Sequence, residues 1–162
     1  MKRCLFFLLL AALLCGCGAQ ETMETVSDEW IVPAMAQPRE IHVRLPQDAV
    51  TPVLEQDSRQ LYMADDYEII LETCSSGDLD ATIRSLSGYG KDQLTVLETQ
   101  QEDAKRYDFV WTTAGEAGDR LGRAVILDDG NYHYCLSVLR AADRTKQTLV
   151  VWRDVFSSFS LI

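Results

Sequence analysis

The sequence predicts an α+β fold, in which an antiparallel β-sheet is flanked by a short central helix and a C-terminal amphipathic helix. Three observations lead to it. Short segments with alternating apolar residues follow one another across short links, which favours antiparallel pairing. The spacing of apolar residues becomes helical near the middle of the chain, and it becomes helical again close to the end.

The first strands precede the central helix. Ile41, Val43 and Leu45 alternate with polar residues and predict a strand that Pro46 closes. Further strands are expected at 60–64 and, more strongly, at 67–74, with the turn pair Asp65-Asp66 between them.

The central helix is expected within residues 75–88. Leu79, Ile83 and Leu86 fall at helical spacing, and serine and aspartate precede them, as is typical of a helix start. Gly88 stands where a C-terminal cap belongs. We therefore expect a short helix of about two to three turns.

More strands are expected after this helix, at 94–99, 106–113, 121–127 and 131–140. The last two are joined by Asp128-Asp129-Gly130-Asn131, a pattern typical of a tight hairpin because glycine and asparagine tolerate positive φ.

A final helix is expected from about Asp143 to Ser157, followed by an extended end at 159–162. One side of this segment is apolar and carries Leu149, Trp152, Val155, Phe156 and Phe159.

The beginning of the chain has the features of an export signal. Met1-Lys2-Arg3 precedes an apolar run, and the run ends on Leu14-Cys15-Gly16-Cys17, which resembles a bacterial lipobox. This resemblance implies a signal peptide at 1–16, a diacylglycerol thioether on Cys17 and attachment to the extracytoplasmic face of the cell membrane. The twelve continuously apolar positions are fewer than the roughly 20 that a membrane-spanning helix needs. An ordinary signal peptide without a lipid is the closest alternative.

The net charge of the chain limits which classes of molecule it can bind. Cleavage before Cys17 would remove Lys2 and Arg3, leaving 13 basic and 25 acidic residues and a formal charge of −12. Such an acidic chain argues against nucleic acid as a partner. The expected partners are the membrane, through the N-terminal lipid, and an envelope protein or small ligand.

Residues 17–38 show no sustained periodicity and are expected to form the lipid anchor and a flexible tether. Residues 39–162 remain, a length that suits one core and one α+β domain. If Cys17 is acylated, this domain keeps only Cys74 and Cys135. Export favours a disulfide between them, and two unpaired, partly buried thiols are the alternative.

The C-terminal half resembles the PsbP-like α/β/α sandwich domains. The resemblance rests on Tyr132-His133-Tyr134-Cys135-Leu136-Ser137-Val138, on a helix with Trp152 and Phe156, and on Ser158-Phe159-Ser160-Leu161. The whole chain also resembles small uncharacterised lipoproteins of Gram-positive anaerobes, through Gly77-Asp78-Leu79, Ala114-Gly115-Glu116 and Leu127-Asp128-Asp129-Gly130. These resemblances imply a sandwich fold and a binding or assembly role, and they carry over no catalytic residue.

The sequence contains no recognisable catalytic motif, so we expect a non-enzymatic protein without cofactor or metal. The histidines His42 and His133 would need a further ligand to hold zinc. The acids of the 128–131 hairpin miss the spacing of a calcium loop. A small envelope hydrolase using dispersed carboxylates such as Glu116 and Asp129 is the alternative function.

Aromatic residues form two alternating stripes. Tyr107 and Trp111 share one strand face with Phe109, and Tyr132 and Tyr134 share a face of another strand. Such stripes usually pack in a core. If one sheet face lacked a covering helix, Tyr107, Trp111, Tyr132 and Tyr134 would form a ligand platform.

Overall fold

A computed structural model describes residues 36–49, 51–114, 118–142 and 148–162. The predicted signal peptide, Cys17 and all of the tether up to residue 35 lie outside the described residues. No helix in the described part of the chain has the length and apolar character needed to cross a membrane.

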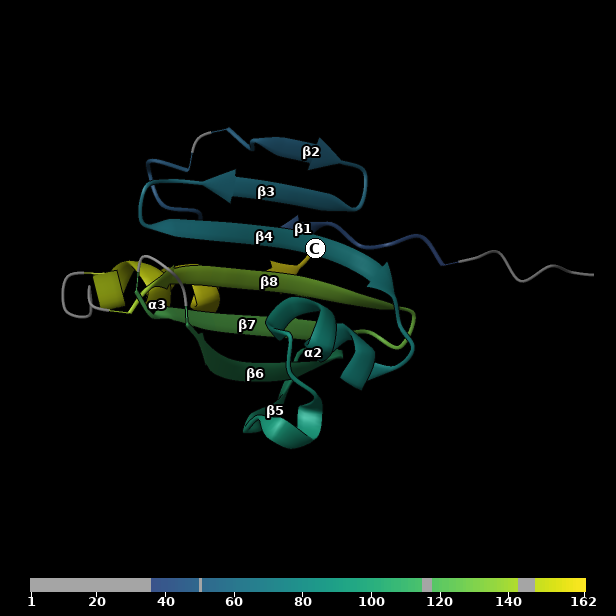
Figure 1. Ribbon diagram of the computed structural model, residues 1–162. Coiled ribbons are helices and arrows are strands. Elements are labelled where there is room, and N and C mark those ends of the chain that lie inside the picture. The colour runs from purple at the N-terminus through teal and green to yellow at the C-terminus, as the bar shows by residue number, and fades with distance from the viewer. Residues whose placement is uncertain (1–35, 50, 115–117, 143–147) are drawn as a thin grey trace, which may run out of the picture. The chain divides into compact units, whose positions relative to one another are not determined.

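The described residues of the domain form a seven-stranded sheet in the order β2-β3-β4-β8-β7-β6-β5, in which every neighbouring pair is antiparallel (Figure 1). This confirms the predicted α+β fold. The strands are β2 (Leu54–Gln56), β3 (Arg59–Met63), β4 (Tyr67–Ser75), β5 (Val96–Gln101), β6 (Ala104–Thr113), β7 (Arg120–Asp128) and β8 (Tyr132–Ala141).

In the part of the chain that the structure describes, one α-helix lies on each face of the sheet. Helix α2 (Leu79–Ser87) covers one face, and α3 (Thr148–Ser158) lies on the other together with a small two-stranded sheet of β1 (Ile41–His42) and β9 (Ser160–Leu161) (Figure 1). A short 3-10 helix, η1 (Lys91–Gln93), follows α2.

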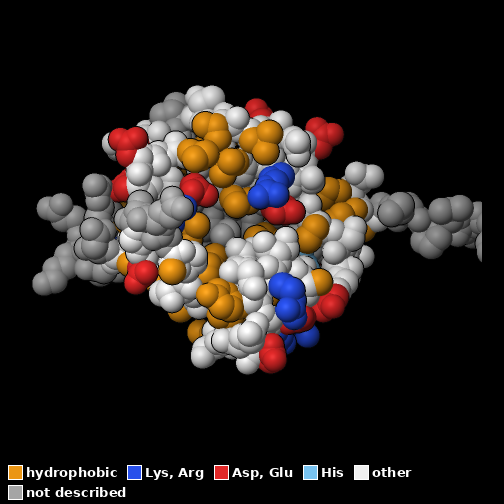
Figure 2. All heavy atoms as spheres, in the orientation of Figure 1, with side chains coloured by type: hydrophobic (Ala, Val, Ile, Leu, Met, Phe, Trp, Pro, Cys, Tyr) orange, Lys and Arg blue, Asp and Glu red, His pale blue; other side chains and the backbone are white. Residues whose placement is uncertain are grey.

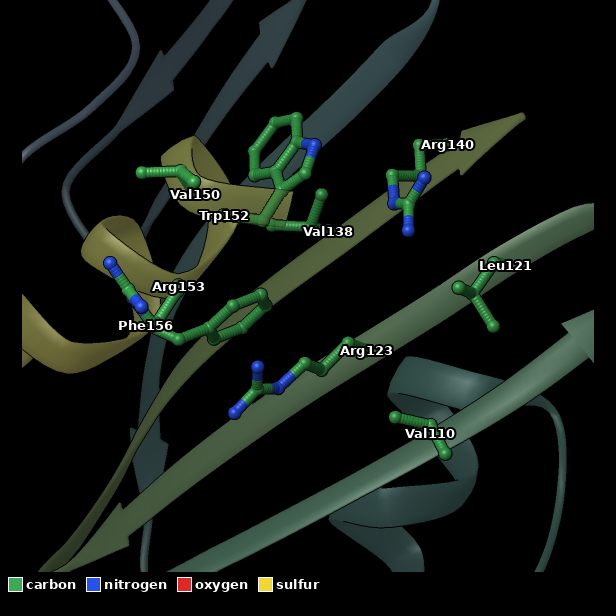
Figure 3. A pocket seen from close by; sticks show the side chains of 9 residues that line it. All are labelled: Val110, Leu121, Arg123, Val138, Arg140, Val150, Trp152, Arg153 and Phe156. Atoms are coloured by element: carbon green, nitrogen blue, oxygen red, sulfur yellow. The ribbon is translucent and has the colours of Figure 1, made fainter. Parts of the chain in front are cut away.

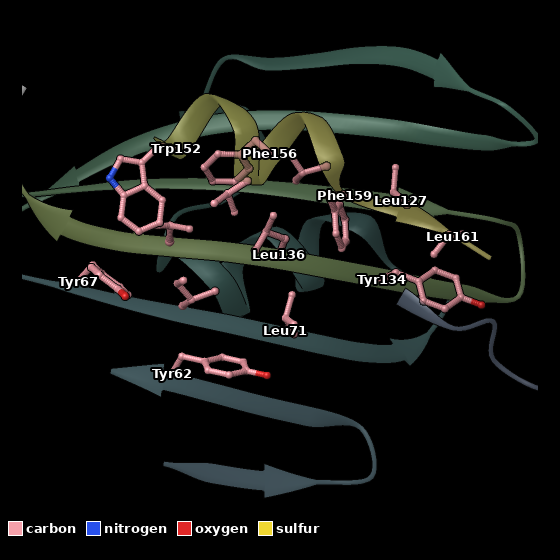
Figure 4. Packing of buried hydrophobic residues seen from close by; sticks show 14 of the residues in the cluster. Tyr62, Tyr67, Leu71, Leu127, Tyr134, Leu136, Trp152, Phe156, Phe159 and Leu161 are labelled. Atoms are coloured by element: carbon pink, nitrogen blue, oxygen red, sulfur yellow. The ribbon is translucent and has the colours of Figure 1, made fainter. Parts of the chain in front are cut away.

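Because both faces are covered, the central strands contribute side chains to two separate cores. On β7, Val125 and Leu127 pack on the α3 side, whereas Ala124 and Ile126 pack on the α2 side. Figure 4 shows the α3-side core, in which Trp152, Phe156 and Phe159 meet Leu136 and Leu71. The continuous apolar run at 124–127 is the sequence pattern of a strand buried on both faces.

The ends of α2 follow the expected capping chemistry. Asp78 is the N-cap, and its carboxylate accepts a hydrogen bond from the Asp80 amide at 2.9 Å. Gly88 closes the helix in the left-handed conformation, at φ 81°, and its amide donates to Arg84 O.

Three elements differ from the expectation. The strand predicted at 41–45 is a two-residue strand, because it pairs only with the equally short β9. The final helix is described from Thr148, since 143–147 lie outside the described residues. Edge strand β2 was not predicted, because all three of its residues are exposed and show no apolar alternation.

Candidate ligand pocket

A pocket of about 410 Å³ lies between α3 and the sheet (Figure 3). Its floor consists of cross-strand neighbours on the α3 face of the three strands β6, β7 and β8. Val110 pairs with Arg123, and Arg123 pairs in turn with Val138. Leu121 and Arg140 form a second pair beside them. The register of the sheet therefore places two arginines among apolar side chains.

Helix α3 supplies the opposite wall. All nine lining residues are described, and none is acidic: Val110, Leu121, Arg123, Val138, Arg140, Val150, Trp152, Arg153 and Phe156. At the rim, Val110 and Val150 are 54% and 55% exposed. The volume and apolar lining fit the usual range of small-molecule sites, and the guanidinium groups are the polar element that would orient a ligand.

Ionic contacts fix the position of Arg123. Its Nη2 donates to Asp108 Oδ1 at 3.0 Å, and its guanidinium lies over the Phe156 ring, 4.2 Å from the centroid. Arg106 donates to the same carboxylate at 2.7 Å and to Phe156 O at 3.1 Å. Asp108 thus bridges two arginines, and Arg123 is held at the pocket before any ligand arrives.

Trp152 carries a buried donor at the pocket wall. The side chain is 7% exposed, and its ring meets Tyr67 edge to face with centroids 5.0 Å apart. Its Nε1 has no hydrogen-bond acceptor among the described residues. Figure 3 shows this nitrogen on the edge of the ring that faces Arg140. A buried indole N–H usually has an acceptor, so an acceptor brought by a ligand would satisfy it.

A second pocket of about 490 Å³ also touches Trp152, but its chemistry differs. It is lined by Asp48, Asp66 and Asp154 with one arginine, Arg44. Its acids resemble the rest of this acidic protein, whereas the lining of the first pocket has three arginines and no acid. We therefore take the first pocket as the candidate site.

The structure does not bring the four aromatic residues of the expected platform together. Tyr107 and Trp111 are buried on the α2 side, whereas Tyr134 is buried on the α3 side. Tyr132 is half-buried and packs against the α3-side core. Core packing accounts for these positions, because each sheet face has a covering helix. Figure 2 shows the face that carries α2, where hydrophobic side chains are scattered among charged ones.

Tyr132 and Tyr134 of β8 instead form hydrogen bonds with the first described residues of the domain. Tyr134 Oη accepts a hydrogen bond from the Arg39 amide at 2.8 Å and donates to Asp129 Oδ2 at 2.9 Å. Tyr132 Oη donates to Ala36 O at 2.7 Å.

Cys74 and Cys135 are both free thiols, so the disulfide expectation is not realised in this structure. They lie on the same sheet face of neighbouring strands, as the sequence suggested, but not opposite each other. Cys74 pairs with His133, and Cys135 pairs with Glu72.

The next residues are those that the sequence offered for hydrolysis, Glu116 and Asp129, and for metal binding, His42 and His133. Glu116 lies outside the described residues. Burial alone would raise the pKa of Asp129, but hydrogen bonds from Tyr132 N, Asn131 N and Tyr134 Oη outweigh it and lower the pKa. His42 and His133 lie on different sheets, and the described residues hold no cluster of three metal-ligating side chains.

Sequence reasoning missed Arg123 and Arg140. A signal was present, since Arg123 has the same strand parity as the apolar Val125 and Arg140 has the parity of Val138. A cation on the buried parity of a central strand indicates either a satisfied internal ion pair or a ligand site.

Comparison with known proteins gives a fold relationship. No family model matches the sequence, and no curated protein matches it. The structure is similar to the crystal structure of LpqN of Mycobacterium tuberculosis, which is involved in cell envelope biogenesis. The TM-score is 0.50 at 11% identity, over 78% of this chain and 86% of LpqN. At this identity the likeness shows a shared fold.

Proposed function

We propose that this protein is a lipid-anchored, extracytoplasmic binding module of the cell envelope, without enzymatic activity, and that the pocket beneath α3 binds an amphipathic anion. The ligand would place an apolar body against the valines and aromatic rings and a carboxylate or phosphate against the arginines. The lipobox supports the anchor, and the fold shared with an envelope protein is compatible with the location.

One observation carries the ligand class: three arginines and no acid line an apolar pocket in a chain with 25 acidic and 15 basic residues. A guanidinium binds carboxylate or phosphate through charge-assisted hydrogen bonds, and these strengthen where apolar walls exclude water. The buried Trp152 Nε1 supplies a further donor for the same acceptor group. An uncharged acceptor would form only the weaker neutral hydrogen bonds with these donors, and a cationic group would be repelled by the guanidinium groups.

Calorimetric titration with two ligands of equal chain length tests the charge preference. Decanoate is expected to bind about tenfold or more tightly than decyltrimethylammonium, both below micelle-forming concentrations, because a charge-assisted hydrogen bond is worth about 1.5–3 kcal/mol. Equal affinity for the two would overturn the anion assignment. Decanoate and decyl phosphate together show whether the site prefers a carboxylate or a phosphate.

Variants locate the binding. Arg123→Gln and Val150→Asp are expected to weaken decanoate binding, the first by removing a donor and the second by adding a carboxylate at the exposed rim. Arg84→Gln is the matched control, since Arg84 lies on α2 and pairs with Asp80 at 2.8 Å. Unchanged affinity in both pocket variants, with thermal midpoints near that of the parent, would place the ligand elsewhere.

Membrane fractionation tests the anchor separately. Cys17→Ala is expected to leave the membrane fraction while the α+β domain still folds, because the predicted lipid and tether precede the domain. Retention of the variant in washed membranes would contradict lipidation at Cys17 and leave the pocket assignment intact.

A further inference from the structure

A smaller pocket, of about 240 Å³, lies on the opposite face of the sheet beside α2. Two thiols line it, together with side chains of α2 and β4: the full set is Glu72, Cys74, Ala81, Thr82, Ser85, Leu86 and Cys135. Cys74 is half-buried and Cys135 is fully buried. Of the two sulfur atoms, Cys74 Sγ is therefore the more accessible to a molecule in the pocket.

The strand register keeps the two thiols from being ideal disulfide partners. Cys74 and Cys135 occupy diagonal positions on the same face of the β4–β8 ladder, with one residue pair, Thr73 and Tyr134, between them. Diagonal Cα atoms in an antiparallel pair are about 7–8 Å apart, whereas disulfides span roughly 4.4–6.8 Å. Closing a disulfide would require β4 and β8 to shift, yet the thiols are close enough for a hydrogen bond from Cys135 to Cys74.

A second donor reaches Cys74 from the helix. Thr82 hydrogen-bonds Cys74, and Thr82 Oγ1 lies 2.9 Å from His133 Nδ1. The threonine hydroxyl has a single hydrogen, and Thr82 Oγ1 also donates to Asp78 O at 3.4 Å, so that hydrogen is shared between this carbonyl and the sulfur. Cys135 and Thr82 are thus the two side chains whose hydrogen bonds lower the pKa of Cys74.

These hydrogen bonds give the two thiols different pKa values. The hydrogen bond from Cys135 lowers the pKa of Cys74 to about 7, against the opposing effects of burial and the Glu72 charge. The same hydrogen bond, together with burial, raises the pKa of Cys135. At neutral pH a large fraction of the accessible Cys74 sulfur is therefore thiolate, whereas the buried Cys135 sulfur keeps its proton.

We propose that Cys74 is a site of S-thiolation, at which a low-molecular-weight disulfide entering the α2-side pocket is attacked and one half of it is retained. The Cys74 thiolate forms a new S–S bond with one sulfur of the disulfide. The original S–S bond breaks, and the second sulfur leaves as a thiolate with the electron pair and is protonated by solvent. Cys135 is a positioning residue: its diagonal placement and its proton disfavour displacement of the retained half.

Peptide mapping tests the site directly. The reduced protein is incubated with glutathione disulfide at pH 7.5, quenched with N-ethylmaleimide under denaturing conditions and digested with trypsin. Cys74 then lies in the peptide 60–84 and Cys135 in the peptide 124–140. Glutathione is expected on 60–84 and maleimide on 124–140. An adduct on 124–140, a disulfide joining the two peptides, or maleimide alone on both would overturn the proposal.

Labelling kinetics separate a positioned thiolate from an ordinary exposed cysteine. The rate of iodoacetamide labelling of Cys74, followed on the same peptide, is expected to rise with a midpoint near pH 7, compared with about 8.5 for a free cysteine. Cys135→Ala and Thr82→Val should move the midpoint upward and slow labelling at pH 7, by up to about tenfold for the cysteine variant. Ser85→Ala, in the same pocket wall, should leave the midpoint unchanged. A midpoint near 8.5 in the parent protein would contradict the role of these donors.

Discussion

Gly122 on β7 lies directly opposite Trp111 on β6, and the indole of Trp111 covers the glycine. A Cβ atom built on Gly122 would overlap the Cε2 and Cζ2 atoms of the ring. Trp111 is itself buried on the α2 side of the sheet. The absence of a side chain at Gly122 is therefore what allows the tryptophan to lie flat on β7.

Gly122→Ala is expected to destabilise the protein by about 1–3 kcal/mol, because the added methyl group must push the Trp111 ring out of its packed position. Chemical denaturation measures the change. Gly77→Ala is the matched control, since nothing lies within 4 Å of a Cβ there. Equal midpoints for the two variants would mean that the ring adapts without cost.

Trp152→Ala should cost about 3–5 kcal/mol, because it removes a buried ring that packs on Tyr67 in the α3-side core. Val151→Ala, at a position of α3 that is 42% exposed, serves as the control and should change stability little. If the Trp152 variant unfolded at the denaturant concentration of this control, α3 would contribute little to the core.

Tyr134→Phe is expected to destabilise by about 1–3 kcal/mol, since it removes one oxygen that serves two partners. The Arg39 amide loses its acceptor and Asp129 loses a donor. Tyr132→Phe deletes only an exposed bond to Ala36 O and should cost less. Denaturation of both variants under the same conditions compares them, and an equal loss would contradict the bridging role of Tyr134.

The order of elements could be predicted because the apolar pattern records it. Residues 67–74 alternate strongly, and the strand observed there is Tyr67–Ser75. Gly88 marks a helix end that the structure places at the same residue. Edge strand β2 could not be predicted in this way, because an exposed strand has no buried side to leave a pattern.

The candidate pocket was harder to predict for a different reason. The sequence shows that Tyr107 and Trp111 share a face, but only the positions of α2 and α3 decide that this face is covered. Likewise, Arg123 and Arg140 become neighbours of one cavity through the β7–β8 register and the placement of α3. The strand parity of Arg123 and Arg140 marks each as an unusual inward-facing cation, but nothing local in the sequence shows that the two line one cavity.

Stability should fall as the pH drops through the titration range of histidine, because His133 is buried in the α2-side face. Burial lowers its pKa below the ordinary 6.5, although the carboxylates of Asp128 and Asp129 oppose the shift. The unfolded chain therefore takes up a proton near pH 6.5 while the folded protein resists it, so the unfolding free energy decreases on acidification by at most about 1.4 kcal/mol per pH unit. Denaturation between pH 7.5 and 5.5 lies above the range of ordinary carboxylates. Because Cys74 also titrates near pH 7, the contribution of His133 is the difference in slope between the parent protein and a His133 variant. In His133→Gln the slope of the unfolding free energy against pH should be reduced. His42→Gln is the control at an exposed position of β1 and should keep the parent slope. Equal slopes in the parent protein and both variants would show that His133 does not couple protonation to folding.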